Sequence, residues 1–252
     1  MSGHSKWATI KRKKEATDAK RSNMYAKLLR AVEVAAREGG GSVEGNMTLA
    51  SAVEKAKSFS VPNENIERAI KRGTGELGDG QKYEEIVYEG YAPGGIALLI
   101  EALTDNRNRT AQEVRHAFTR NGGSLGETGT VAWQFTRKGV IVVEKAVAPD
   151  EERLLELALE GGAEDLTDSE SSWDIITAPH DFKAVEAALE TAGVPIFSAE
   201  LSMLPQSTIP VAGSEATAVL RLIDALEELD DVQNVYANFD IPDEIFQAVS
   251  AE

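Results

Sequence analysis

The first thirty residues concentrate the kind of side chain that binds phosphate. Lysine and arginine dominate this segment, and only Glu15 and Asp18 oppose them. Neutralising a phosphate group releases condensed counterions, which drives binding to nucleic acid. Trp7 and Tyr25 lie among the cations and offer flat surfaces for stacking on bases. The segment is therefore a candidate nucleic-acid contact, the alternative being a solvated tail. Its cations are Lys6, Lys11, Arg12, Lys13, Lys14, Lys20, Arg21, Lys27 and Arg30.

A second dense polar site lies at residues 104–110, where Arg107 and Arg109 fall at the predicted start of a helix. Two arginines at that end oppose the helix dipole. An anion bound there would offset this cost and could also accept hydrogen bonds from the free backbone N–H groups. The pattern indicates either a phosphate contact or a helix cap with two surface arginines.

Charge divides the chain into three zones. The 252 residues carry a net charge of -16, yet residues 1–82 hold 16 Lys and Arg against 10 Asp and Glu. Residues 83–138 hold 6 Lys and Arg against 7 Asp and Glu, and residues 139–252 hold 4 Lys and Arg against 25 Asp and Glu. Such blocks favour separate modules with separate roles. The acidic zone indicates a solvated surface, with binding of a protein or repulsion of nucleic acid as alternatives.

Composition argues against several classes of protein. The absence of cysteine excludes disulfides, thiol nucleophiles and cysteine metal sites. No apolar run approaches the roughly 20 residues that span a bilayer, and the basic start lacks the apolar core of a secretory signal. His4, His116 and His180 are far apart and share no ligand spacing. We therefore expect a cytoplasmic protein without catalytic residues, cofactor or metal.

The basic side chains are predicted to lie on three short amphipathic helices. The first carries an apolar stripe from Tyr25 to Ala36 and ends at the glycines of 39–41, the second covers 47–58, and the third covers 63–73. Their outer faces are expected to carry Lys27, Arg30, Arg37, Lys55, Lys57, Arg68, Lys71 and Arg72.

A glycine-rich segment at 73–80 follows the helices. It contains G-x-G-x-x-G, but it follows a helix and precedes a strand, the reverse of the order in dinucleotide sites. An interdomain hinge is the favoured interpretation. Beyond it, strand and helix patterns alternate. Strands are predicted at 85–91, 96–103, 130–135, 140–144, 164–166, 173–177, 197–204, 207–211 and 232–239, and helices at 107–120, 150–160, 181–192 and 214–229.

The element order between 139 and 204 is βαββαβ, the ferredoxin-like pattern. The final strand–helix–strand unit is too small to fold alone, so it is expected to complete the elements of 81–138. We therefore predict a multidomain α and α+β protein, in which a three-helix domain at 1–80 precedes two ferredoxin-like α/β sandwich domains around a cleft. The sandwich domains are 81–138 with 205–241, and an inserted domain at 139–204.

Five blocks of sequence resemble the YebC/PmpR family. They are GHSKWATIK at 3–11, PNENIERAIKRG at 62–73, YEGYAPGG at 88–95, LTDNRNRT at 103–110 and EVRHAF at 113–118. The resemblance is dense over 1–139 and rests on element order beyond that. Departures are small, with Val61 where Met is usual and Thr9 where Asn is usual.

The resemblance implies a non-enzymatic, cytoplasmic regulator of gene expression with three domains around a cleft. Family members are described as DNA-binding transcriptional regulators, and the family also includes the mitochondrial translational activator of cytochrome oxidase. Some bacterial members look like ribosome-associated factors that relieve stalling at proline runs. Arg107 and Arg109 would then line the cleft, and the acidic C-terminal part would orient the protein or meet a protein partner.

Two targets therefore compete, promoter DNA and ribosomal RNA or tRNA. No recognition helix of the helix-turn-helix type is evident in the sequence, which favours recognition of RNA shape and backbone. The family description favours DNA. A hydrolase that uses carboxylates of the cleft is the least favoured class.

Overall fold

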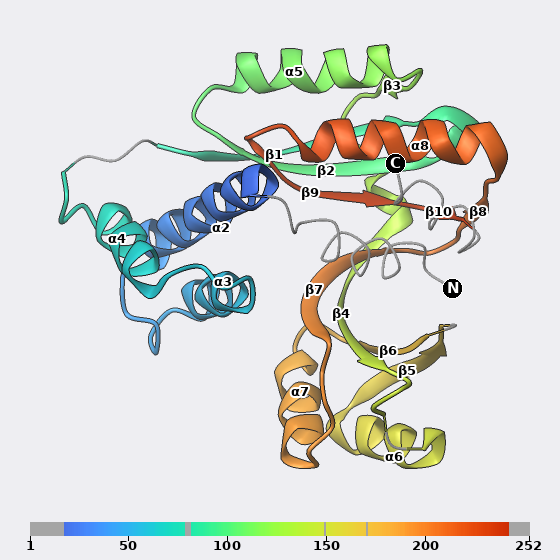
Figure 1. Ribbon diagram of the computed structural model, residues 1–252. Helices are drawn as coiled ribbons and strands as arrows, with labels where there is room; N and C mark the ends of the chain where they lie inside the picture. The colour runs from blue at the N-terminus through green and yellow to red at the C-terminus, as the bar shows by residue number, and fades with distance from the viewer. Residues whose placement is uncertain (1–17, 79–81, 149, 170, 242–252) are drawn as a thin grey trace. The chain divides into compact units, whose positions relative to one another are not determined.

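A computed structural model describes residues 18–78, 82–148, 150–169 and 171–241 (Figure 1). The chain separates into two compact units. The first unit holds the described residues up to 128 together with 217–235, and the second holds 129–216 together with residues from 236 onward. The elements are those of the multidomain α+β class predicted from the sequence. The three-domain boundaries stay a prediction.

Three helices form the N-terminal part of the first unit, at the positions that the sequence predicts. They are α2 (Asp18–Gly39), α3 (Met47–Ser58) and α4 (Asn63–Gly73). Helix α3 begins after Asn46, whose side chain accepts a hydrogen bond from the Leu49 N–H (3.1 Å). The three helices share one core, which includes Leu28, Val32, Ala35, Leu49, Val53, Ala56, Ile66 and Ala69.

Gly73 ends α4 and also lets two helices approach closely. A Cβ atom at this position would lie 2.3 Å from the carbonyl oxygen of Glu33 and 2.8 Å from the Cβ of Ala36, both on α2. Such distances are too short for any side chain, so the glycine is required by packing between α2 and α4. The sequence pattern by itself indicates only a helix stop at Gly73.

The sheet of the first unit has the strand order β3-β1-β2-β9. Strands β1 (Glu84–Tyr91) and β2 (Ala97–Thr104) pair antiparallel along their whole length, and Pro93–Gly95 forms the tight turn between them. Strands β3 (Ser124–Leu125) and β9 (Val232–Ala237) occupy the two edges. A tight turn joins the two central strands of this sheet, whereas the two central strands of a βαββαβ unit are not consecutive, so the connectivity is a permuted form of that pattern.

Helices α5 (Arg107–Arg120) and α8 (Gly213–Glu227) lie on one face of this sheet (Figure 1). Gly123 shows how closely both helices pack. A Cβ atom on Gly123 would lie 2.8 Å from Leu222 of α8 and 2.9 Å from Phe118 of α5. Both helices bury their apolar faces, as their hydrophobic periodicity predicts.

The sheet of the second unit is ferredoxin-like. Its strands β4 (Phe135–Glu144), β5 (Ala163–Asp168), β6 (Ser172–Thr177) and β7 (Ser198–Pro205) follow the order β5-β6-β4-β7, and all neighbours pair antiparallel. This is the arrangement that the βαββαβ pattern predicts.

Helices α6 (Glu151–Gly161) and α7 (Phe182–Thr191) cover one face of that sheet (Figure 1). Helix α6 begins at Asp150, whose carboxylate accepts from the Arg153 N–H (3.0 Å). It ends at Gly162, which has φ of +99°. The core between helices and sheet includes Ile141, Val143, Leu154, Leu157, Trp173, Ile175, Phe182, Val185 and Leu189.

The prediction of a strand at 130–135 is wrong. Residues Ala132–Gln134 form a 3₁₀ turn, and β4 begins only at Phe135. Alternation of apolar residues suggests a strand, but the Gln134 N–H donates to the Val131 carbonyl (2.9 Å) and closes a turn instead. Strand β4 then runs without interruption through position 139, where the inserted domain was expected to begin.

The strand predicted at 207–211 is much shorter in the structure. Only Ile209–Pro210 (β8) is extended, and it pairs in parallel with Phe239–Asp240 (β10). The two prolines nearby limit the hydrogen bonds that this segment can donate. This small pair is separate from both four-stranded sheets and belongs to the second unit.

Candidate nucleic-acid interface

One polar stripe of α2 holds the end of α8 and the turn that follows it. Asn23, Lys27 and Arg30 lie at i, i+4 and i+7 on α2, and each donates to a main-chain carbonyl oxygen. The acceptors are the carbonyls of Glu228 (3.2 Å) for Asn23, Glu227 for Lys27 and Asp230 (2.8 Å) for Arg30. Cationic groups at a helix C-terminus satisfy its free carbonyls and complement its dipole.

The carboxylate of Asp231 is the centre of this contact. The residue is 1% exposed. Its Oδ2 accepts from Arg109 (2.6 Å), and the hydroxyls of Thr104 (3.0 Å) and Thr110 (2.7 Å) lie within hydrogen-bond distance of the same oxygen. Its Oδ1 accepts from Arg30 (3.0 Å). We call these five residues the Asp231 junction, which joins α2, β2, α5 and the segment before β9.

Arg30 makes further contacts beside its ion pair with Asp231. Its Nη1 also donates to the carbonyl of Leu103 (3.2 Å), and its guanidinium lies over the ring of Tyr83, 5.1 Å from the centroid. A cation–π contact of this kind is favourable in addition to the ion pair.

The environment of Asp231 keeps it ionised. Burial by itself would raise the pKa of Asp231, but hydrogen bonds from Arg109, Thr110 and Thr104, with the charge of Arg109, outweigh it. The pKa of Asp231 is therefore below its ordinary value. The same carboxylate, together with Asp105, raises the pKa of Arg109 above its ordinary value through hydrogen bonds. The junction is thus a fixed ion pair at neutral pH.

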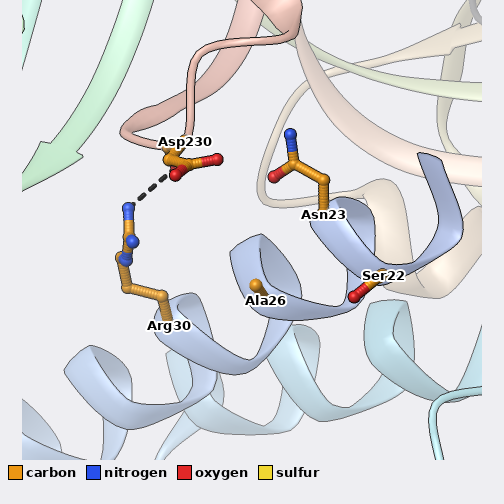
Figure 2. Close-up of a pocket in the computed structure, with 5 residues that line it drawn as sticks. All are labelled: Ser22, Asn23, Ala26, Arg30 and Asp230. Carbon is orange, nitrogen blue, oxygen red and sulfur yellow. Dashed lines mark hydrogen bonds between the residues drawn. The ribbon is translucent and has the colours of Figure 1, made fainter. Parts of the chain in front are cut away.

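A shallow hollow of about 360 Å³ opens beside this contact. It is lined by Ser22, Asn23, Ala26, Arg30 and Asp230 (Figure 2). Figure 2 shows Arg30 turned toward Asp230, whose carbonyl oxygen it contacts. The cation of this hollow is therefore engaged within the protein, and the exposed residue Asp230 adds an acidic group to its lining.

The basic cluster at the N-terminus lies largely outside the described residues. This applies to Lys6, Trp7, Lys11, Arg12, Lys13 and Lys14, and to the side chain of Lys20. Arg21 is exposed on α2. Lys27 was expected on the outer face of the helices, but it is 8% exposed and contacts the end of α8. The sequence pattern missed this because the partner lies 200 residues away.

The two predicted cations at the end of α4 differ in their surroundings. Lys71 is exposed. Arg72 lies with its Nε 3.1 Å from Glu33 of α2, a buried carboxylate that also accepts from Arg37 (3.2 Å). Arg72 therefore joins two helices, whereas Lys71 faces solvent.

Arg107 and Arg109, two positions apart, also differ. The Arg109 guanidinium is bound by Asp231 and by Asp105 (2.8 Å). Arg107 has a 70% exposed side chain, and its nearest carboxylate is that of the exposed Glu84, at 3.7 Å. The anion expected at the start of this helix is thus supplied by the protein itself for Arg109, and Arg107 remains accessible.

Helix α5 exposes further basic side chains that were not among the predicted contact residues. Arg115, His116 and Arg120 are all exposed on the helix, and Arg107 is exposed in its first turn. The signal is present in the sequence, because these residues fall on the polar side of an amphipathic helix whose other side carries Val114. Helix α5 therefore presents a positively charged outer surface.

Other kinds of site find no support in the described ranges. No group of three His, Asp or Glu side chains there could hold a metal ion. Within the same ranges, no helix combines the length and the apolar character needed to cross a membrane.

Comparison with known proteins assigns the chain to a family. The model for the TACO1/YebC N-terminal domain matches residues 5–76, and the model for the second and third domains matches 83–239. A "Probable transcriptional regulatory protein" of Pelotomaculum thermopropionicum is 60% identical over 96% of this chain and all of that protein. A protein of the same name from Thermotoga maritima is 52% identical over 99% of this chain and 98% of its own.

A solved structure agrees with this assignment. The crystal structure of a conserved hypothetical protein from Aquifex aeolicus has a TM-score of 0.81 and 50% identity, and the match covers 91% of this chain and 94% of that one. The chain therefore belongs to the TACO1/YebC family.

Proposed function

We propose that this protein is a nucleic-acid-binding regulator of gene expression that performs no catalysis. One observation carries the proposal, the reversal of charge between the N-terminal 82 residues and the acidic remainder. The names of its relatives point to regulation of transcription, so DNA is the first polymer to test. Concentrated lysine and arginine bind phosphate regardless of polymer, which makes RNA the second.

The structure divides the predicted contact residues into two groups. Lys27, Arg30 and Arg109 are engaged within the first unit, so a phosphate would have to displace a carboxylate or carbonyl partner to reach them. Arg21, Lys71 and Arg107 are exposed. We assign phosphate contact to this second group, to the cluster Lys6, Lys11, Arg12, Lys13 and Lys14, and to the outer face of α5.

The test is a salt series with the full chain on a DNA duplex and on a single-stranded RNA. Neutralising Lys11, Arg12, Lys13 and Lys14 to Gln should weaken binding. It should also lower the slope of log affinity against log salt by about 0.9 for each duplex phosphate that the variant no longer neutralises, or about 0.7 for a single strand. The matched control neutralises Lys145, Arg153, Lys183 and Arg221, the four cations of the acidic zone. It changes net charge equally and should leave the slope unchanged.

Equal weakening in both variants would mean that net charge alone matters, and the assignment of the N-terminal cluster would be wrong. A parallel co-sedimentation with ribosomes over the same salt range separates the polymers. Sequence-selective DNA binding without ribosome association supports transcription. Ribosome association that withstands more salt than DNA binding would instead assign the protein to translation.

A further inference from the structure

Among the described residues of the second unit, Trp133 is the largest exposed apolar side chain. It is 68% exposed and lies in the 3₁₀ turn Ala132–Gln134 before β4. Its indole N–H donates to the carbonyl of Thr130 (3.1 Å). The polar atom of the ring is thus bound within the turn, and the remaining ring surface faces solvent.

Amide side chains hold this turn in place. Gln206 donates from its Nε2 to the carbonyl of Trp133 (3.1 Å), and its main-chain N–H donates to the carbonyl of Gln134 (2.8 Å). The side chain of Gln134 accepts from Asn238 (3.2 Å), which is 2% exposed. These hydrogen bonds fix the turn that carries Trp133. The exposed ring is therefore a rigid platform, which loses little conformational entropy when a ligand binds.

The surroundings of Trp133 differ from the rest of the second unit in charge. The segments that meet at the turn are 129–138, 201–213 and 236–239, joined by the pairing of β4 with β7 and of β8 with β10. They contain no Asp or Glu, whereas residues 139–252 contain 25, and the first acidic residue after them is Asp240, the last residue of β10. They contain Arg137, which is exposed, and Lys138, which is paired with Glu164 of β5 (2.5 Å). A phosphate can therefore approach this end of an otherwise repulsive unit.

The same segments do not resemble a site for an apolar protein partner. Among the described residues, the other large exposed apolar side chains lie elsewhere, at Met47, Leu77, Val87, Val147, Leu155 and Leu159. Besides Trp133, the exposed side chains on these segments are mostly polar or cationic, such as Thr136, Arg137 and Gln206, and the exposed apolar ones, Pro210 and Ala212, are small. A single aromatic ring among cations and amides is the composition of a surface that stacks a base and contacts its phosphate.

We propose that Trp133 stacks on an unpaired nucleobase of a bound nucleic acid, with Arg137 contacting the adjoining phosphate. This inference rests on the proposed function and extends it, because it places a second contact outside the basic N-terminal segment. It also specifies the form of the ligand. A base in a duplex has both faces covered, so the platform selects single-stranded segments.

The test uses the full chain and a single-stranded oligonucleotide over a salt series. Trp133→Ala should weaken binding about tenfold at every salt concentration without changing the salt slope, since stacking releases no counterions. Trp133→Phe should restore most of the affinity. Arg137→Gln should lower the slope by about 0.7. Both side chains replaced are exposed, and thermal unfolding verifies that the variants remain folded.

A fluorescence measurement adds a direct readout. In a Trp7→Phe, Trp173→Phe background the remaining indole is Trp133, and a single strand should quench its emission while a blunt duplex should not. Failure of the two proposals can be told apart. If the wild type binds the single strand and Trp133→Ala binds it equally well, the platform is wrong and the proposed function stands. If the wild type binds no nucleic acid, both are overturned.

Discussion

Arg107 and Arg109 stand two residues apart on the same helix, yet their surroundings differ. Arg109 contacts the buried carboxylate of Asp231 and the half-buried one of Asp105, while Arg107 projects into solvent with a weak contact to Glu84. The same division separates Arg30, in the Asp231 junction, from Arg21, which is exposed on α2. Residue type therefore does not distinguish a structural cation from a ligand-binding one. The presence of a buried anionic partner does.

The largest effect on stability is expected when Asp231, the partner shared by Arg30 and Arg109, loses its charge. Asp231→Asn keeps the shape but leaves Arg30 and Arg109 without their shared anion, so we expect a decrease of about 3 kcal/mol in the free energy of unfolding. Urea denaturation measures it. Asp230→Asn is the matched control, because Arg30 contacts the main-chain carbonyl of Asp230 and not its side chain. Equal decreases in the two variants would show that net charge, and not the junction, stabilises the fold.

A smaller effect is expected when the two arginines are replaced one at a time. Arg109→Ala should destabilise the protein by about 1–2 kcal/mol, a value reduced because its side chain is 44% exposed and solvent screens the pair. Arg107→Ala should change stability by less than about 0.5 kcal/mol. Nucleic-acid affinity should show the reverse order at matched salt. If Arg107→Ala proves the more destabilising variant, the division into structural and accessible cations fails.

The smallest effect is a dependence on pH. The pKa of Asp231 is lower in the folded protein than its ordinary value. Its contribution is therefore fully present above the unfolded value of about 3.9 and is lost as pH falls through the lower folded pKa. The stability difference between wild type and Asp231→Asn should be complete at pH of about 6. It should begin to narrow once the pH falls below the unfolded pKa of about 3.9, and should go on narrowing as Asp231 of the folded wild type becomes neutral. A difference that stays constant with pH would mean that charge on Asp231 contributes nothing.

The contrast extends to the two sheets. The ferredoxin-like sheet of the second unit follows from element order alone, because βαββαβ admits few arrangements. The sheet of the first unit takes its edge strand β9 from more than a hundred residues after β2. No local pattern in the sequence specifies such a pairing, although the incomplete group of elements at 81–138 indicates that a partner is missing. At Trp133 a local pattern is present but misleading. The alternation of apolar residues predicts a strand at 130–135, whereas the structure has a 3₁₀ turn that exposes the indole ring.

The helices, most of the strands, the family and the charge asymmetry could all be predicted from the sequence. These properties depend on residues a few positions apart, on hydrophobic period, caps and glycine stops, or on composition. Which of the cations are accessible depends on contacts that form only in the folded protein. Arg30 and Lys27 meet partners about 200 residues later, and Arg109 meets Asp231 across 122 positions. Asp231 is buried, where an unpaired charge is costly, so the fold pairs it with Arg30 and Arg109 and leaves other arginines to solvent.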